Sequence, residues 1–173
     1  MVLTTERLIL RPWLHSDANA LYELARDPKV GYAAGWREHH SPTQSLDIIK
    51  TVLDNDESYA VCTRGFSRLI GAAALKPADD SRLAEGDTER ELGYWIGRAF
   101  WGEGYGTEAA QALVERAFTT LACTRIWAGV YVGNSRSRRV LEKCGFSYVR
   151  TDADQPVELL GETRDEEVFV LER

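Results

Sequence analysis

The sequence predicts a mixed α/β fold in one domain that spans residues 1–173. Segments in which apolar and polar residues alternate recur between segments in which apolar residues have helical spacing. Their order is one strand, two helices, three strands, a helix, a strand, a helix and two strands. A hydrophobic fraction of 44% and a charged fraction of 28% are typical of a globular domain rather than a disordered chain.

Seven segments alternate as strands do. They are residues 7–13, 58–64, 68–75, 89–96, 125–132, 146–151 and 166–172. Residues 65–67 fit the turn of a hairpin between the second and third of these strands. The acidic stretch 79–87 fits a surface loop ahead of the fourth strand.

Four segments predict helices. Ser16 fits the cap of the first, which residues 27–28 end, and residues 41–44 form a capping-box start for the second. The second helix should have one apolar face, made by Leu46, Ile49, Val52 and Leu53. The third runs from residue 107, and the fourth is capped by Asn134 and ends at Gly145. Residues 29–40 have no period and are expected to form a loop rich in aromatic residues.

Three glycines, at 102, 104 and 106, precede the third helix directly. A helix start carries unpaired N–H groups, and glycines leave those groups open to an anion such as phosphate. A loop that needs glycine only for its backbone angles would look the same. No lysine precedes Thr107, which excludes a Walker loop, and the glycine spacing does not fit a dinucleotide fingerprint. A nucleotide-phosphate enzyme is therefore a remote alternative.

This stretch resembles motif A of the GNAT superfamily of acetyltransferases, Gln/Arg-x-x-Gly-x-Gly/Ala, with Trp101, Gly104 and Gly106 at the marked places. Tryptophan in the first place is usual in the RimJ/RimL-like branch. Residues 4–12 are similar to the amino-terminal signature of that branch, and residues 134–146 are similar to its motif B. The resemblance thus extends over three motifs in family order.

The resemblance implies one mixed, mostly antiparallel sheet of seven strands, splayed between the fourth and fifth strands and flanked by about four helices. It implies acetyl-CoA as cosubstrate, with its diphosphate on the amides of the glycine turn and its pantetheine arm along the strand that ends at residue 96. The cofactor-binding residues carried over are Trp95, Ile96, Trp101, Gly102, Gly104, Tyr105, Gly106, Thr107, Asn134 and Arg139. An amide near Trp95 or Ile96 would polarise the thioester carbonyl.

An amine acceptor must lose a proton before it attacks, and the leaving thiolate must gain one. Glu91 on the central strand is the candidate base and Glu89 its substitute, although both could be plain surface carboxylates. Many GNAT enzymes use a tyrosine of motif B as the acid, but Leu141 stands at that position. Ser137 matches a serine proposed for this role in the RimJ/RimL-like branch, or it is an ordinary helix serine. Tyr131 is a weaker option.

The implied function is an N-acetyltransferase that acts on a primary amine, either a protein N-terminus or a small molecule. The alternative is a non-catalytic module that binds or senses acyl-CoA. Tyr32 and Trp36 lie in the loop where related enzymes form the acceptor pocket, or they merely cover the sheet. The sequence leaves both the acceptor and homodimer formation open.

Charge and composition narrow the partners further. A net charge of −6 argues against a nucleic-acid partner. The start of the chain does not resemble a signal peptide and no stretch is long enough to span a membrane, so we expect a cytoplasmic protein without a membrane partner. The three cysteines and three histidines lack metal-ligand spacing, so no metal is expected, and the pair His39 and His40 should be solvated.

Overall fold

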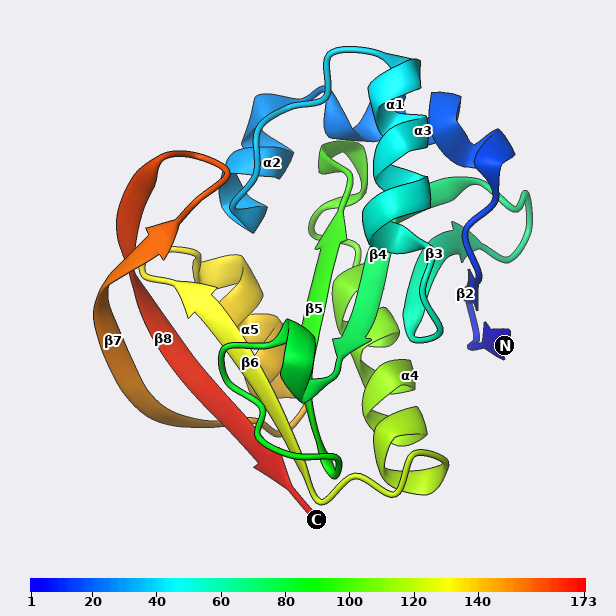
Figure 1. Ribbon diagram of the computed structural model, residues 1–173. Coiled ribbons are helices and arrows are strands. Elements are labelled where there is room, and N and C mark those ends of the chain that lie inside the picture. The colour runs from blue at the N-terminus through cyan, green and yellow to red at the C-terminus, as the bar shows by residue number, and fades with distance from the viewer.

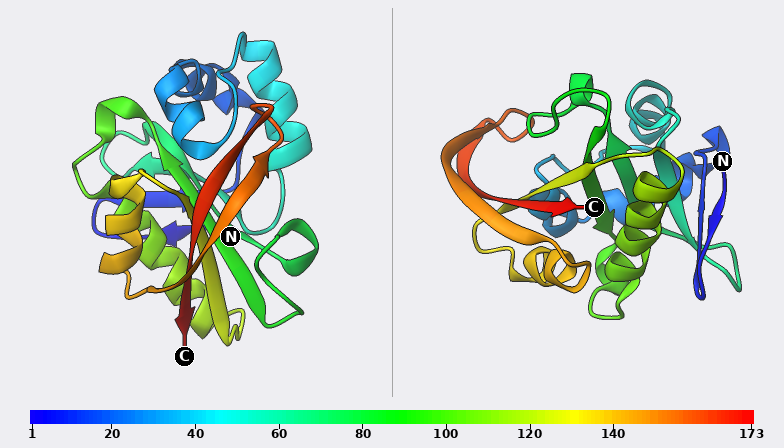
Figure 2. Two further views of the ribbon diagram at one scale, coloured as in Figure 1. Left: turned by 90° about the vertical axis from the view of Figure 1, so that its left-hand side faces the viewer. Right: turned by 90° about the horizontal axis from the view of Figure 1, so that it is seen from below.

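The computed structural model describes residues 1–173 and is built around one sheet of eight strands (Figure 1). The strand order is β1-β2-β3-β4-β5-β6-β8-β7, and every neighbouring pair is antiparallel except β5 and β6. The strands are β1 (Leu3–Thr4), β2 (Leu8–Arg11), β3 (Ser58–Thr63), β4 (Leu69–Lys76), β5 (Glu89–Ile96), β6 (Arg125–Tyr131), β7 (Ser147–Val157) and β8 (Glu162–Glu172). β7 and β8 curve away from the plane of the other strands (Figure 2).

Five α-helices flank this sheet. They are α1 (Ala18–Ala25), α2 (Pro28–Ala34), α3 (Pro42–Ile48), α4 (Tyr105–Thr119) and α5 (Ser135–Lys143). α4 and α5 cover one face, where Leu113 and Leu141 are fully buried with residues of the central strands. α1 and α3 cover part of the other face, and α2 lies above the gap between β5 and β6 (Figure 1). No helix has the length and apolar character needed to cross a membrane.

The sheet is split between β5 and β6, the fourth and fifth strands expected from the sequence. These parallel strands pair only over Glu89–Glu91 with Arg125–Trp127. Beyond residue 91, β5 remains paired with β4 alone, while β6 remains paired with β8 up to Tyr131. The predicted splay is confirmed, and it leaves one backbone edge of β5 open.

Glu89 holds the closed end of the split together. Its carboxylate accepts hydrogen bonds from the Trp127 indole at 2.7 Å, the Arg125 guanidinium at 2.9 Å and the Glu85 amide at 2.9 Å. Burial by itself would raise the pKa of Glu89, but these hydrogen bonds and the Arg125 charge outweigh it, so the pKa is lowered. The residue considered as a substitute base is therefore committed to a structural network.

The structure has one strand and one α-helix more than the sequence predicted. The sheet has eight strands rather than seven because the two-residue strand β1 pairs with β2. Helix α2 replaces part of the loop expected at residues 29–40: the Asp27 side chain accepts from the Lys29 amide, Pro28 takes a first-turn position, and Gly35 ends the helix with a φ of 90°. The Asp27-Pro28 pair therefore begins a helix as well as ending α1.

Three local predictions were wrong. Ser16 does not cap α1, because residues 15–17 form a 3₁₀ turn in which the Asp17 carboxylate accepts from the Leu14 amide. Ser41 does cap α3, but residues 49–53 continue it as a π-helix, and Val52 is 61% exposed instead of joining the apolar face. His39 is buried, and its ring is 2.8 Å from the Ser45 hydroxyl.

Candidate active site

The glycine turn presents a row of free backbone amides. None of the six N–H groups from residue 102 to residue 107 donates a hydrogen bond, and the first paired amide is that of Glu108, which bonds to the Gly104 carbonyl at 3.1 Å. Gly102 and Gly104 have φ values of 85° and 82°, which other residues rarely adopt. No side chain caps α4. The turn and the helix dipole together form a site suited to a phosphate group.

Gly106 is needed for a different reason, which is close packing. A Cβ at this position would lie 3.3 Å from the Tyr94 ring and 3.7 Å from Val140. The absence of a side chain therefore lets the start of α4 approach both β5 and α5. The glycine turn is therefore packed between β5 on one side and α5 on the other.

The amino-terminal signature supports the turn from outside. The Glu108 carboxylate accepts from the Thr5 hydroxyl at 2.6 Å and from the backbone and side chain of Arg7 at 2.8 and 2.7 Å. The Arg7 guanidinium also donates to the Glu103 carbonyl at 2.9 Å and lies over the Tyr105 ring. Two of the three sequence motifs are thus in direct contact. Glu108, which sequence reasoning passed over, joins them.

The open edge of β5 presents the backbone of Tyr94 and Ile96 to the split. Hydrogen-bonded pairs alternate along an antiparallel ladder, and the Gly97 amide donates to the Ile70 carbonyl on β4. Trp95, two residues earlier and opposite Ala72, therefore also faces β4. Of the two amides expected to polarise a thioester, that of Trp95 belongs to the ladder and only that of Ile96 faces the split.

Trp101 fixes the end of this edge. Its indole N–H donates to the Ile96 carbonyl at 2.6 Å. The Arg136 guanidinium from α5 stacks on the same indole at 3.7 Å and so bridges the two sides of the split. Arg139, the arginine expected to meet the cofactor phosphates, is exposed and makes no ion pair. Arg136 is exposed as well and makes no ion pair, but it is the arginine that contacts Trp101.

Tyr94 and Ser137 form a hydroxyl pair inside the split. The Tyr94 phenol lies 2.9 Å from the Ser137 hydroxyl. Burial raises the pKa of Tyr94 to about 12, so the phenol keeps its proton near neutral pH. Leu141, at the position of the usual family tyrosine, is 1% exposed and belongs to the core. The tyrosine hydroxyl beside Ser137 thus comes from β5 and not from the helix of motif B.

Asn134 caps α5 as expected, with its side-chain oxygen accepting from the Ser137 amide at 3.2 Å. Its side-chain nitrogen also reaches the Ala33 carbonyl of α2 at 3.5 Å. One side chain thus orders the helix start that carries Ser137 and contacts the helix above the split.

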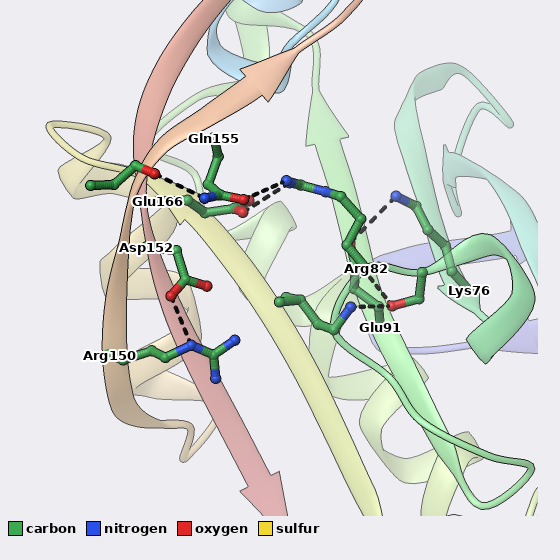
Figure 3. Close-up of polar contacts among 10 residues, drawn as sticks. Lys76, Arg82, Glu91, Arg150, Asp152, Gln155 and Glu166 are labelled. Carbon is green, nitrogen blue, oxygen red and sulfur yellow. Dashed lines mark hydrogen bonds and ion pairs between the residues drawn. The ribbon is translucent and has the colours of Figure 1, made fainter.

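Glu91 lies on the face of the sheet opposite α4 and α5 (Figure 3). Its carboxylate accepts from the Ser81 hydroxyl at 2.7 Å and lies 3.4 Å from the Lys76 ammonium group. On the same face Arg82 crosses from the loop before β5 to Glu166 of β8, at 2.9 Å. Burial raises the pKa of Glu166. A carboxylate from each wall of the split therefore faces the same space.

Two cavities flank α2, and Tyr32 lines both of them. One has a volume of about 630 Å³ and is also lined by Trp36, Trp101 and Arg136. The other, of about 850 Å³, lies against Tyr131 and Arg164. Trp36 packs edge-on against Trp95, with ring centroids 5.5 Å apart, so it both covers the sheet and lines a cavity. Both residues expected in an acceptor pocket therefore lie at cavities.

A family model described as an acetyltransferase (GNAT) domain matches residues 7–147. The chain belongs to this family. It is also 29% identical over 149 residues to an uncharacterized N-acetyltransferase, p20, of Bacillus licheniformis, over 83% of this chain and 81% of that protein. The predicted family is confirmed.

Solved structures agree with the fold of this GNAT chain. An acetyltransferase of the GNAT family from Bacillus anthracis has a TM-score of 0.86 at 22% identity, covering 99% of this chain and 98% of the other. A ribosomal-protein-serine acetyltransferase-like protein from Vibrio cholerae has a TM-score of 0.81 at 24% identity, covering 100% and 98%. The GNAT fold is confirmed.

As a GNAT acetyltransferase, the chain uses acetyl-CoA as its acyl donor. The residues present fit that molecule, because the unpaired amides of residues 102–107 suit its diphosphate and the open edge of β5 suits the amides of its pantetheine arm. No group of histidine, cysteine or acidic side chains in the structure could hold a metal ion.

Proposed function

We propose that this chain transfers an acetyl group from acetyl-CoA to the nitrogen of a primary amine, by direct attack within a ternary complex. The observation that carries the proposal is the combination of two features at the split: six backbone amides without hydrogen bonds at the start of α4, and a strand edge of β5 that no other strand covers. A site that holds the donor in an open-ended slot leaves its acyl group accessible from the far side of the sheet. An acceptor can therefore bind while the donor is present.

Acetyl-CoA supplies the activated acyl group as a thioester. The Ile96 amide, fixed by β5 and facing the split, is the donor aimed at the developing oxyanion. Asn134, through its side-chain amide, binds the pantetheine arm, and Arg136 neutralises phosphate charge beside Trp101. Arg139 remains a second candidate for the phosphates.

Glu91 is the proposed base that accepts the proton of the amine, directly or through one water. Ser81 and Lys76 orient its carboxylate from the same side. We do not assign this role to Glu89, because its two oxygens already accept three hydrogen bonds. The base is thus a single residue on the wall of the split where the strands part.

Ser137 and Tyr94 together supply the proton for the leaving thiolate. Their hydroxyls are 2.9 Å apart, so the proton that Ser137 gives can be replaced from the Tyr94 phenol. The tyrosine missing from motif B is in this way replaced by one from β5. Tyr131 faces the cavity beneath α2 instead.

The acceptor is a primary amine of a protein N-terminus or of a small molecule, and it approaches beside Tyr32 and Trp36. The thiol released from acetyl-CoA should be measured with a panel of amines, together with the heat of acetyl-CoA association. Turnover with at least one amine supports the proposal. Binding of acetyl-CoA without thiol release from any amine would instead indicate a non-catalytic acyl-CoA module.

A further inference from the structure

The cavity of about 850 Å³ beneath α2 contains a cation whose hydrogen bonds are incomplete. Arg164 of β8 lines this cavity, and its side chain is only 13% exposed. Its Nε donates to the Glu162 carboxylate at 2.5 Å and its Nη1 to the Tyr32 carbonyl at 2.6 Å. Its Nη2 is buried and has no acceptor. A buried guanidinium nitrogen without a partner is costly, so its retention suggests a ligand that supplies the acceptor.

Two aromatic rings fix the orientation of this guanidinium. The Tyr32 ring lies 3.8 Å from its central carbon and the Tyr131 ring 4.9 Å from it. Because the rings contact the group from its faces, its hydrogen bonds can run only along its edge. Tyr32 is 59% exposed, so its ring can turn into solvent and uncover Nη2.

A carboxylate lies on the same face of β8, two residues away. Side chains alternate along a strand, so Arg164 and Glu166 point to one side, with Cα atoms roughly 7 Å apart. Glu166 is directly opposite Tyr131 in the register with β6 and is only 7% exposed. The space around Tyr131 therefore has Arg164 at one end and, at the other, a buried carboxylate that is ion-paired with Arg82 at 2.9 Å.

The charged side chains that line the cavity balance one another. Besides Arg164, its charged side chains are Arg136, Glu162 and Asp165, two cations and two anions in all. Glu162 is bound to Arg164, and the Asp165 carboxylate accepts from the Asp154 amide. A lining without net charge, in which Arg164 Nη2 is buried without an acceptor, suits a zwitterion better than a polycation such as a polyamine.

We propose that the amine acceptor of this enzyme carries a carboxylate several bonds from its nitrogen, and that Arg164 Nη2 binds this carboxylate while the amine points toward Glu166 and Glu91. The proposal rests on the acetyltransferase function proposed above and names its substrate class. Arg164 is on this view a specificity-determining residue. It takes no part in the transfer itself.

The test compares ω-amino carboxylates, from β-alanine to 6-aminohexanoate, with alkylamines of the same length. The wild-type enzyme should show a kcat/KM about 10- to 100-fold higher for the best amino carboxylate than for its alkylamine, as expected for one charge-assisted hydrogen bond. Arg164→Gln should remove this preference through KM, and Arg164→Lys should keep part of it. Arg37→Gln is the matched control, because Arg37 bonds to two carbonyls of the β7–β8 turn outside the cavity.

Equal rates for both series in the wild type, or an equal loss for both in Arg164→Gln, would overturn the assignment while leaving the acetyltransferase function intact. Failure to acetylate any amine would count against the function instead. If no amine is acetylated, calorimetric titration of the same amino carboxylates in the presence of CoA still tests whether Arg164 binds the carboxylate. Binding that is lost in Arg164→Gln and retained in Arg37→Gln supports the assignment, and no binding to the wild type refutes it.

Discussion

The hydroxyl pair of Tyr94 and Ser137 gives a prediction about the acid of the reaction. Tyr94→Phe and Ser137→Ala each remove one member of a hydrogen bond of 2.9 Å. If the bond is only structural, each change costs about 1 kcal/mol of folding stability and little activity. If the pair protonates the thiolate, each change lowers kcat by about 10²-fold or more.

A double-mutant cycle separates the two cases. Residues that act as one proton-donating unit are not additive, so the double variant should be no slower than the slower single variant. Single-turnover acetyl transfer should be measured, because steady-state rates also contain product release. Thermal unfolding of each variant controls for structure.

The high pKa of Tyr94 adds a second readout. Because burial raises that pKa to about 12, the phenol stays protonated well above neutral pH, and kcat should not fall through loss of this proton below about pH 10. Single variants that keep kcat within threefold of the wild type, or a double variant whose losses multiply, would refute the acid role of the pair.

Three further predictions concern the base, the core and the closed end of the split. Glu91→Gln should slow acetylation of lysine-type amines more than that of α-amines, because deprotonation at pH 7 costs about 4.6 kcal/mol for the first and about 1 kcal/mol for the second. Thiol release by the variant and the wild type measures this difference. An equal loss of rate on both kinds of amine, or no loss on either, would remove Glu91 from the mechanism. Glu57→Ala leaves the Arg116 guanidinium, 8% exposed and bound to both oxygens of Glu57, buried without its partner. Denaturant unfolding should show a loss of about 3 to 5 kcal/mol, whereas a loss under 1 kcal/mol would contradict this account. The lowered pKa of Glu89 contributes stability that is present above its unfolded value near 4.5 and is lost as pH falls toward the folded value. The acid unfolding curve of Glu89→Gln should therefore be flatter below about pH 4.5 than that of the wild type, and an unchanged slope would contradict the assignment.

Sequence reasoning succeeded where one short pattern determines local structure. The glycine turn, the Asn134 cap and the alternation of β6 all lie where the sequence predicted them. It failed where a distant contact decides. From the sequence, Tyr94 was expected to be an ordinary residue of a core strand. Only the packing of α5 against β5 brings its phenol to Ser137. Arg164 likewise lies in a polar stretch, and its confinement depends on Tyr32, far away in the sequence.

Three residues of β5 have different roles in the split between β5 and β6. At its start Glu89 binds Trp127 and Arg125 and fixes the parallel pairing, at its middle Glu91 faces the space where the strands part, and at its end Ile96 presents an unpaired edge. Glu89 and Glu91 lie on the same face of the strand. Glu89 accepts hydrogen bonds from two side chains of β6, whereas the partners of Glu91 are Ser81 and Lys76. The point at which β6 leaves β5 therefore separates the carboxylate that is bound to β6 from the one that we propose as the base. Two glutamates that are two positions apart on one strand, Glu89 and Glu91, can thus have different roles although their side chains are chemically identical.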